Sequence, residues 1–198
     1  MRILLLYSND NAKVLYKKLY DFGENVILCS EKITLNIVQK IKPEYVISYN
    51  YSFIVDEDII KFMNGRIVNL HTSYLPWNRG SHPNLWSFIE NSPKGVTIHQ
   101  LSEKLDRGQI LLQKEMMFDV RKETFATSYD KLNAEIVKLF ISNWEAIKKG
   151  EIILKNQEGE GSYHRTKDYL NLKKRIDFSW NDNIYEFLKK YDNLKKSR

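Results

Sequence analysis

Asn69 and His71 stand two residues apart near the end of an apolar run, in the stretch NLHTSYLPWNRGSHPN at residues 69–84. A strand that served only the core would end on another apolar side chain. An imidazole beside an amide can instead move protons and stabilise an oxygen on which negative charge develops. We therefore take Asn69 and His71 as candidate catalytic residues. Spacing alone leaves a second interpretation open, in which His71 is a strand-end histidine bonded to the backbone.

A carboxylate, Asp106, follows later in the short polar loop EKLDRG. Asp106 and Gly108 could form a simple turn, because both residue types are common in turns. Beside His71, however, a carboxylate could orient the imidazole and accept a proton. The sequence therefore offers an amide, an imidazole and a carboxylate from separate segments.

The elements that must position these groups follow from the apolar pattern. The first 70 residues alternate between apolar runs and helical patterns, and the runs are RILLLYS, NVILCS, YVISYN and RIVNLHTS. Strands buried between helices have this pattern, which predicts an α/β fold with a doubly wound, mostly parallel sheet. Ligands bind such sheets beyond the carboxyl ends of the strands, where Asn69 and His71 would lie. We expect the loop that holds Asp106 to lie at the same edge.

The rest of the chain predicts one further strand pair, one long helix and a polar tail. KGVTIHQLS and QILLQKEMMFDV are joined by so short a loop that we expect an antiparallel pair. Residues 124–150 predict the longest helix, with Gly150 as its stop. We expect residues 1–150 to form a catalytic domain and residues 151–198 to form a C-terminal extension packed on or near it.

Several kinds of chemistry lack their usual sequence signals. GxSxG is absent, and Cys29, the only cysteine, lies on an early strand. The four histidines lack the close pair spacing of zinc motifs, so we expect no metal. No GxGxxG follows the first strand, which argues against a dinucleotide cofactor. Acyl or related group transfer remains, with a nucleophile that belongs to the substrate. We interpret His82, His99 and His164 as structural or surface residues.

Composition limits the cellular compartment and the kinds of partner that we expect for the protein. A single cysteine suits a reducing cytoplasm, and no apolar run approaches the roughly 20 residues of a membrane helix. We therefore expect a cytoplasmic protein with no membrane partner. Residues 1–147 carry 18 Lys and Arg against 17 Asp and Glu, whereas the last 51 residues carry 13 against 8. Such a tail could bind nucleic acid or a phosphate-bearing partner such as a nucleotide, but a solvated end is the commoner case.

Four motifs occur in order between residues 69 and 113: Asn69-x-His71, LP at 75–76, NRG at 78–80 and GVTIHQLSEKLDRGQILLQ at 95–113. Together they resemble the formyltransferases that use 10-formyltetrahydrofolate. That family includes glycinamide ribonucleotide transformylase, methionyl-tRNA formyltransferase and the sugar N-formyltransferases. The resemblance implies the family fold, 10-formyltetrahydrofolate as the formyl donor, and Asn69, His71 and Asp106 as catalytic residues. Thr72 stands where the family usually has proline, which changes loop rigidity but removes no catalytic side chain.

The resemblance also implies two binding regions and a substrate class. Folate would bind the segment before the motif strand and the loop that leads to Asp106, through Tyr51, Ser52, Phe53, Ile54 and Leu105. LPWNRGSHPNLWS and YHRTKD look closest to sugar N-formyltransferases that act on nucleotide-linked amino sugars for surface polysaccharide such as lipopolysaccharide. The acceptor would then contact Trp77, Asn78, Arg79 and Gly80, with its pyrophosphate near Arg79 and the basic C-terminal segment.

Alternatives remain at this point. Glycinamide ribonucleotide transformylase is the second candidate, because it has about this length. Methionyl-tRNA formyltransferase carries a further domain for which we expect no room in 198 residues. A nucleic-acid-binding protein is the third candidate, and it would leave the Asn-x-His and Asp-x-Gly motifs unexplained. Family members often dimerise, so a homodimer is also an expectation.

Overall fold

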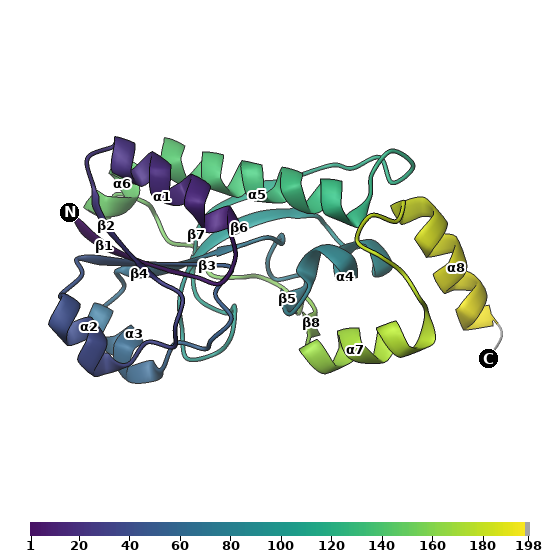
Figure 1. The fold of residues 1–198 in the computed structure, drawn as a ribbon, viewed down its shortest axis with the longest axis horizontal. Coiled ribbons are helices and arrows are strands. Elements are labelled where there is room, and N and C mark those ends of the chain that lie inside the picture. Colours follow the sequence, from purple (N-terminus) through teal and green to yellow (C-terminus); the bar gives the residue numbers. More distant parts are fainter. Residues whose placement is uncertain (197–198) are drawn as a thin grey trace.

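The computed structural model describes residues 1–196, which form a mixed six-stranded sheet flanked by helices (Figure 1). The strand order is β2-β1-β3-β4-β6-β7. The strands of this sheet are β1 Arg2–Tyr7, β2 Asn25–Cys29, β3 Tyr45–Tyr49, β4 Ile67–His71, β6 Gly95–Gln100 and β7 Ile110–Glu115. The helices are α1 Asn11–Asp21, α2 Leu35–Ile41, α3 Glu57–Met63, α4 Pro83–Ile89, α5 Phe125–Ser142, α6 Trp144–Lys149, α7 Thr166–Arg175 and α8 Ile184–Lys196. A second, two-stranded sheet joins β5 Arg79–Gly80 and β8 Tyr163–His164.

The sheet topology confirms the expected α/β fold. Strands β1 to β4 are parallel, and β6 and β7 form the predicted antiparallel pair. Strand β6 also runs antiparallel to β4, with Asn69 opposite His99 and His71 opposite Thr97. Residues opposite each other in an antiparallel pair project from the same face of the sheet. The register therefore brings His99 beside Asn69.

The two faces of the sheet have separate apolar cores. In β1, Ile3 and Leu5 belong to the core under α1 and α5, whereas Leu4 and Leu6 belong to the core under α2 and α3. Successive side chains of a strand point to opposite faces. The continuous apolar run RILLLY thus arises because helices cover both faces (Figure 1).

A third apolar cluster lies beyond the sheet and holds the end of the chain. Helices α4, α7 and α8 gather around the start of α5, and Figure 1 shows this group at one end of the molecule. Phe125, the first residue of α5, is fully buried and its ring packs against the rings of Phe88, Phe178 and Phe187. The helices of the predicted C-terminal extension therefore pack against α4 and α5 through apolar contacts, while positions 197 and 198 of that extension lie outside the described residues.

The helix predicted over residues 124–150 is interrupted once. It begins as expected, where the Thr124 side chain accepts a bond from the N–H of Thr127, but α5 ends at Ser142 and α6 begins at Trp144. Between them Asn143 leaves the helical conformation, and its Nδ2 donates to the carbonyl of Leu139. Asparagine side chains compete with the helix backbone in this way. Gly150 ends α6 with a φ of 72°.

Truncating Phe125 tests whether the third cluster contributes to global stability. Phe125→Ala should lower the free energy of unfolding by about 3–5 kcal/mol, because it removes a ring of α5 that packs against α4, α8 and the segment before α8. Phe22→Ala is the matched control, since the Phe22 side chain is 50% exposed, and it should change stability by less than about 0.5 kcal/mol. Urea unfolding of both variants measures this, and equal effects of the two changes would contradict the proposed anchoring.

Candidate active site

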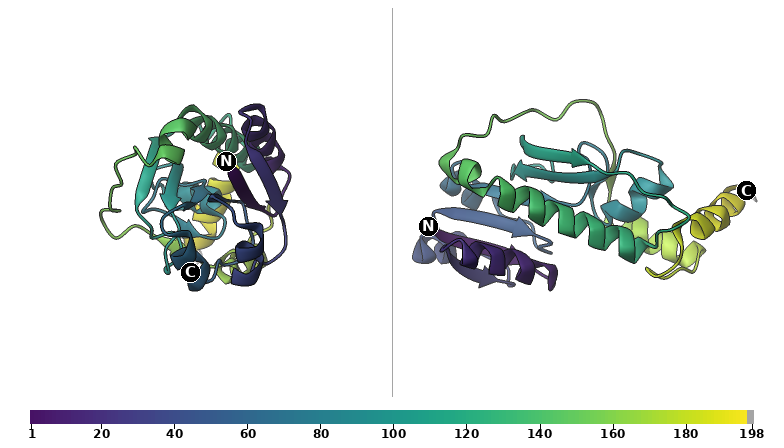
Figure 2. Two further views of the ribbon diagram at one scale, coloured as in Figure 1. Left: turned by 90° about the vertical axis from the view of Figure 1, so that its left-hand side faces the viewer. Right: turned by 90° about the horizontal axis from the view of Figure 1, so that it is seen from above.

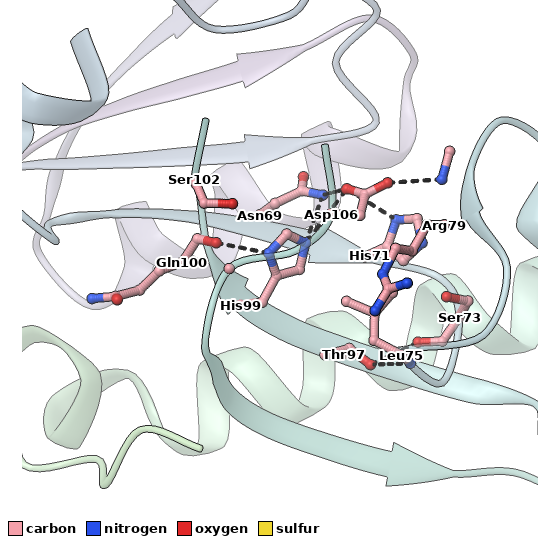
Figure 3. A network of polar contacts seen from close by, with 12 residues as sticks. Asn69, His71, Ser73, Leu75, Arg79, Thr97, His99, Gln100, Ser102 and Asp106 are labelled. Carbon is pink, nitrogen blue, oxygen red and sulfur yellow. Dashed lines mark hydrogen bonds and ion pairs between the residues drawn. The ribbon is translucent and has the colours of Figure 1, made fainter. Parts of the chain in front are cut away.

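Four polar side chains meet over the second half of β4 and the end of β6 (Figure 3). Strand β4 contributes Asn69 and His71, β6 contributes His99, and the loop between β6 and β7 contributes Asp106. All of them lie on the face that α2 and α3 cover, since Ile67 on that face still belongs to the apolar core. From Asn69 onward the same face carries polar side chains and is closed by loops in place of helices.

The loop that holds Asp106 takes a different path from the one we expected. Because β6 runs against β4, the loop starts beside the amino end of β4, where the N–H of Leu101 donates to the carbonyl of Ile67. The expectation that the loop lies at the carboxyl edge was wrong. The loop instead folds back across the face of the sheet, and this path brings Asp106 to Asn69 and His71.

Asp106 lies at the centre of the cluster (Figure 3). Its Oδ2 accepts a hydrogen bond from the N–H of Gly80 at 2.9 Å. Its Oδ1 is 3.4 Å from Asn69 Nδ2, 3.6 Å from His99 Nε2 and 3.9 Å from His71 Nδ1. These last contacts are long, as catalytic contacts often are before substrate binds. Asp106 also has a φ of 52°, a conformation that costs energy in a residue with a side chain and that clusters at functional sites.

The two central titratable groups have shifted pKa values. Burial alone would raise the pKa of the Asp106 carboxyl, but the imidazoles of His71 and His99 and the N–H of Gly80 outweigh it and hold that pKa well below its usual range. Burial lowers the pKa of His71, and this effect exceeds the opposing effect of the Asp106 charge. At neutral pH the site therefore holds a carboxylate beside a neutral imidazole, a pair that can accept a proton.

His99 is a site residue that sequence analysis missed. We interpreted it as structural, but its Nε2 lies 3.3 Å from Asn69 Nδ2 and faces Asp106. Its Nδ1 is 2.8 Å from the carbonyl of Gln100, which can only accept, so Nδ1 carries the hydrogen and Nε2 faces the cluster with its lone pair when the ring is neutral. The feature that places His99 in the site is the register between β4 and β6, which sets it opposite Asn69. No local sequence pattern reveals this register.

Two positions in the motifs are glycine for a steric reason. A Cβ on Gly108 would lie 1.7 Å from the carbonyl oxygen of Gln100, so the Asp-x-Gly turn can approach β6 only with glycine. Gly80 has a φ of 87°, and a Cβ there would lie 2.2 Å from the carbonyl oxygen of His164. Since the Gly80 N–H holds Asp106, both glycines contribute to the position of the carboxylate.

The predicted acceptor-binding residues lie in different environments. Trp77 is partly exposed. Asn78 is fully buried, and its side chain bonds to Glu90, Ser92 and Ser162. Arg79 is also buried, and its guanidinium donates to groups within the protein. Of the four predicted residues, Trp77 is therefore the one most exposed to solvent, and Gly80 is the one whose backbone contacts Asp106.

A further residue beside Gly80, Tyr163, comes from the motif YHRTKD. Its ring lies against Gly80 and is half exposed, and the guanidinium of Arg165 lies 6.0 Å above the ring. Strands β5 and β8 pair in parallel, with Arg79 opposite Tyr163. The C-terminal segment thus places an aromatic ring and a cation next to the turn that binds Asp106.

The predicted folate-binding residues follow the carboxyl end of β3, except for Leu105 in the catalytic loop. The side chains of Phe53, Ile54 and Leu105 are large, apolar and exposed. Tyr51 is half-buried, and its hydroxyl donates to the carbonyl of Glu31. The N–H of Ser52 donates to the side chain of Ser8. Exposed apolar side chains next to backbone polar groups are features that can bind a flat ring with amide-like edges.

The described part of the chain, residues 1–196, contains no group of three or more His, Cys, Asp or Glu side chains placed to share a metal ion. It also contains no helix long and apolar enough to cross a membrane.

Comparison with known proteins identifies the family. Residues 10–143 match the formyl transferase family model, so the chain belongs to the formyl transferase family. The fold is similar to that of the formyltransferase PseJ from Anoxybacillus kamchatkensis, solved in complex with UDP-4,6-dideoxy-4-formamido-L-AltNAc and tetrahydrofolate. The two chains are 37% identical, the TM-score is 0.86, and the match covers 93% of this chain and 96% of PseJ.

Two curated relatives extend the comparison. The dTDP-4-amino-4,6-dideoxyglucose formyltransferase of Mycobacterium tuberculosis strain H37Rv is 31% identical over 62% of this chain and 52% of its own length. The methionyl-tRNA formyltransferase of Thermotoga maritima is 30% identical over 84% of this chain and 50% of its own length. The chain thus spans about half the length of the curated relatives it matches.

The lowered pKa of His71 can be measured directly. An exposed histidine is half protonated near pH 6.5, and because burial disfavours the imidazolium, His71 should still be neutral there. Imidazole ¹⁵N–¹H spectra as a function of pH, assigned by the signal missing in His71→Asn, measure its pKa. In Asp106→Asn the pKa should fall further, since the carboxylate favours the charged ring. A His71 pKa at or above 6.5 would contradict the described environment.

Proposed function

We propose that the protein transfers the formyl group of 10-formyltetrahydrofolate to the amine of a nucleotide-linked aminodeoxy sugar. The observation that carries the proposal is the match with PseJ, which extends over nearly the full length of both chains, and PseJ was solved with a UDP-linked formamido sugar and tetrahydrofolate. A UDP-linked 4-amino sugar is accordingly the acceptor we propose first. The product would serve surface polysaccharide synthesis in the cytoplasm, and family likeness adds the expectation of a homodimer.

The proposed donor site uses the exposed apolar side chains near β3. 10-Formyltetrahydrofolate supplies the activated formyl group. We propose that Phe53, Ile54 and Leu105 form apolar walls for its ring and that the backbone of Tyr51 and Ser52 contributes polar contacts. Binding there would bury side chains that are otherwise exposed to water, which stabilises the complex by the hydrophobic effect.

The proposed acceptor site lies on the other side of Asp106, where the C-terminal segment meets β5. Trp77 and Tyr163 offer exposed aromatic rings, and Arg165 offers a cation for the pyrophosphate. Arg79, which we also expected to bind the pyrophosphate, donates to Gln157 and Glu160, and Asn78 is fully buried. We propose that both side chains act through the shape of the loop and that Gly80 acts through its N–H.

In the proposed chemistry each central side chain has a separate role. Asn69 Nδ2 is an N–H donor that can stabilise the formyl oxygen as negative charge develops on it, and His71 can donate to the same oxygen. Asp106 is ionised and buried, so it can orient His71 and accept the proton that the attacking amine releases, directly or through water. The same proton then passes to the leaving nitrogen of tetrahydrofolate as the bond between that nitrogen and the formyl carbon breaks. We propose that His99 fixes the Asn69 amide from the β6 side, because its Nε2 accepts from Asn69 Nδ2.

Acceptor preference tests the proposed function. With 10-formyltetrahydrofolate, the purified protein should formylate at least one UDP-, dTDP- or GDP-linked aminodeoxy sugar, and the UDP-linked 4-amino sugars should give the highest kcat/KM. Glycinamide ribonucleotide and methionyl-tRNA are the control acceptors, because other formyltransferases use them. A higher kcat/KM for either control acceptor would refute the sugar as the acceptor, whereas the proposed transfer of a formyl group would still stand.

Asp106→Asn tests the proton acceptor. The change keeps the size of the side chain but removes the charge, so kcat should fall by about 10²–10⁴-fold while the affinity for folate changes little. Asp119→Asn is the matched control, because Asp119 lies on the surface with Lys122 and Arg121 as its partners, and it should leave kcat unchanged. Rates at saturating donor and acceptor separate chemistry from binding. Near-normal turnover of Asp106→Asn would refute the assignment.

A further inference from the structure

Residues 155–164 connect both catalytic loops, although they lie outside the part that matches the family model. Figure 2 shows the extended connection from α6 passing along the outer side of the sheet to β8. Lys155 exchanges two backbone hydrogen bonds with Ile110 at the start of β7. Further on, the N–H of Arg79 donates to the carbonyl of Ser162, and the N–H of Ser81 donates to the carbonyl of His164. The segment therefore touches the loop of Asp106 and then the loop of Gly80.

One side chain, Gln157, bonds to both loops. Its Nε2 donates to the carbonyl of Asp106 at 2.8 Å and to the carbonyl of Gly108 at 2.9 Å. Its Oε1 accepts from Arg79 Nη2 at 2.7 Å and from Arg79 Nε at 3.1 Å. The orientation of the amide is fixed by chemistry, because carbonyls only accept and a guanidinium only donates. Gln157 thus makes four hydrogen bonds, and each of them ends on a catalytic loop.

These bonds hold the backbone that carries the catalytic carboxylate. Asp106 has a positive φ, which the chain adopts only when surrounding contacts hold it. The bonds from Gln157 hold the carbonyls of Asp106 and Gly108, which flank Arg107. The bond from Gly80 N–H holds the Asp106 carboxylate, and the neighbouring Arg79 is bound to Gln157. The same amide therefore fixes the backbone that carries the carboxylate and the turn that binds it.

We propose that Gln157 is a positioning residue for formyl transfer, which sets the distance between Asp106 and His71 through its bonds to both catalytic loops. The proposal rests on the proposed function for its effect on turnover. Its geometric part, the distance between the carboxylate and the imidazole, is independent of any substrate.

Gln157→Met is the main test, because methionine is similar in size, carries no charge and makes none of the four bonds. A displacement of a catalytic group by about 1 Å can cost about 10²-fold in rate. We therefore expect kcat to fall 10- to 100-fold, while the KM for folate stays within about 2-fold of the original value.

The pKa of His71 is the second measurement. If Asp106 moves away, His71 loses a charge that favours its protonated form. The pKa of His71 in the free protein, measured by ¹⁵N spectra, should then fall below that of the unchanged protein. Asp106, His99 and Arg79 are the charged or titratable groups that act on His71, and the substitution alters the charge of none of them.

A second variant and a control keep the test decisive. Gln157→Glu keeps the acceptor for Arg79 but replaces the amide donor, so it should also lower kcat at least 10-fold. This variant tests the positioning role if Gln157→Met does not fold. Glu158→Gln, at the exposed neighbouring position, should keep the original kcat and His71 pKa. Unchanged kcat and His71 pKa in folded Gln157 variants, or a lower melting temperature alone, would overturn the proposal. If the unchanged protein formylates no acceptor, the His71 pKa still decides the positioning role while the proposed function fails.

Discussion

A buried negative charge on Asp106 is the constraint on which the site depends. A carboxylate removed from water is costly unless it is hydrogen-bonded or paired. Here a backbone N–H from Gly80, an amide from Asn69 and two imidazoles surround it. These groups come from β4, β6 and the turn at β5, so three segments must lie close to the loop that carries Asp106. The need to satisfy one charge therefore accounts for the meeting of β4, β6, the β5 turn and the loop that folds back over the sheet.

The sheet itself could be predicted because its physical cause is local. Four apolar runs separated by helical patterns are enough to indicate parallel strands covered on both faces, and the strands β1 to β4 occur where the runs lie. A short loop between two further runs was enough to indicate the β6–β7 pair. In contrast, the break at Asn143 depends on one side chain that competes with the helix, and composition does not show which asparagine will do so.

The site could be predicted only in part, because some of its geometry arises between distant segments. Residue type, position and family likeness predicted Asn69, His71 and Asp106, and the structure brings these three side chains together. His99 was not predicted, since its place beside Asn69 depends on which strand pairs with β4 and in which register. Likewise, Arg79 belongs to a loop rich in donors, but its guanidinium is bound by Gln157, 78 positions later in the chain. A sequence shows which donors exist, whereas the fold decides which of them remain available.

The two-residue pairing of β5 with β8 has a consequence for how such enzymes can be recombined. Tyr163 and Arg165 follow Gln157 in the chain, so the segment that supports Asp106 ends just before the segment that faces the proposed acceptor. A chimaera joined after Gln157 would exchange the acceptor side and keep the native support of the carboxylate. A chimaera joined before Lys155 would replace both at once. The order of residues along one extended segment thus sets where specificity can be altered without disturbing the chemistry.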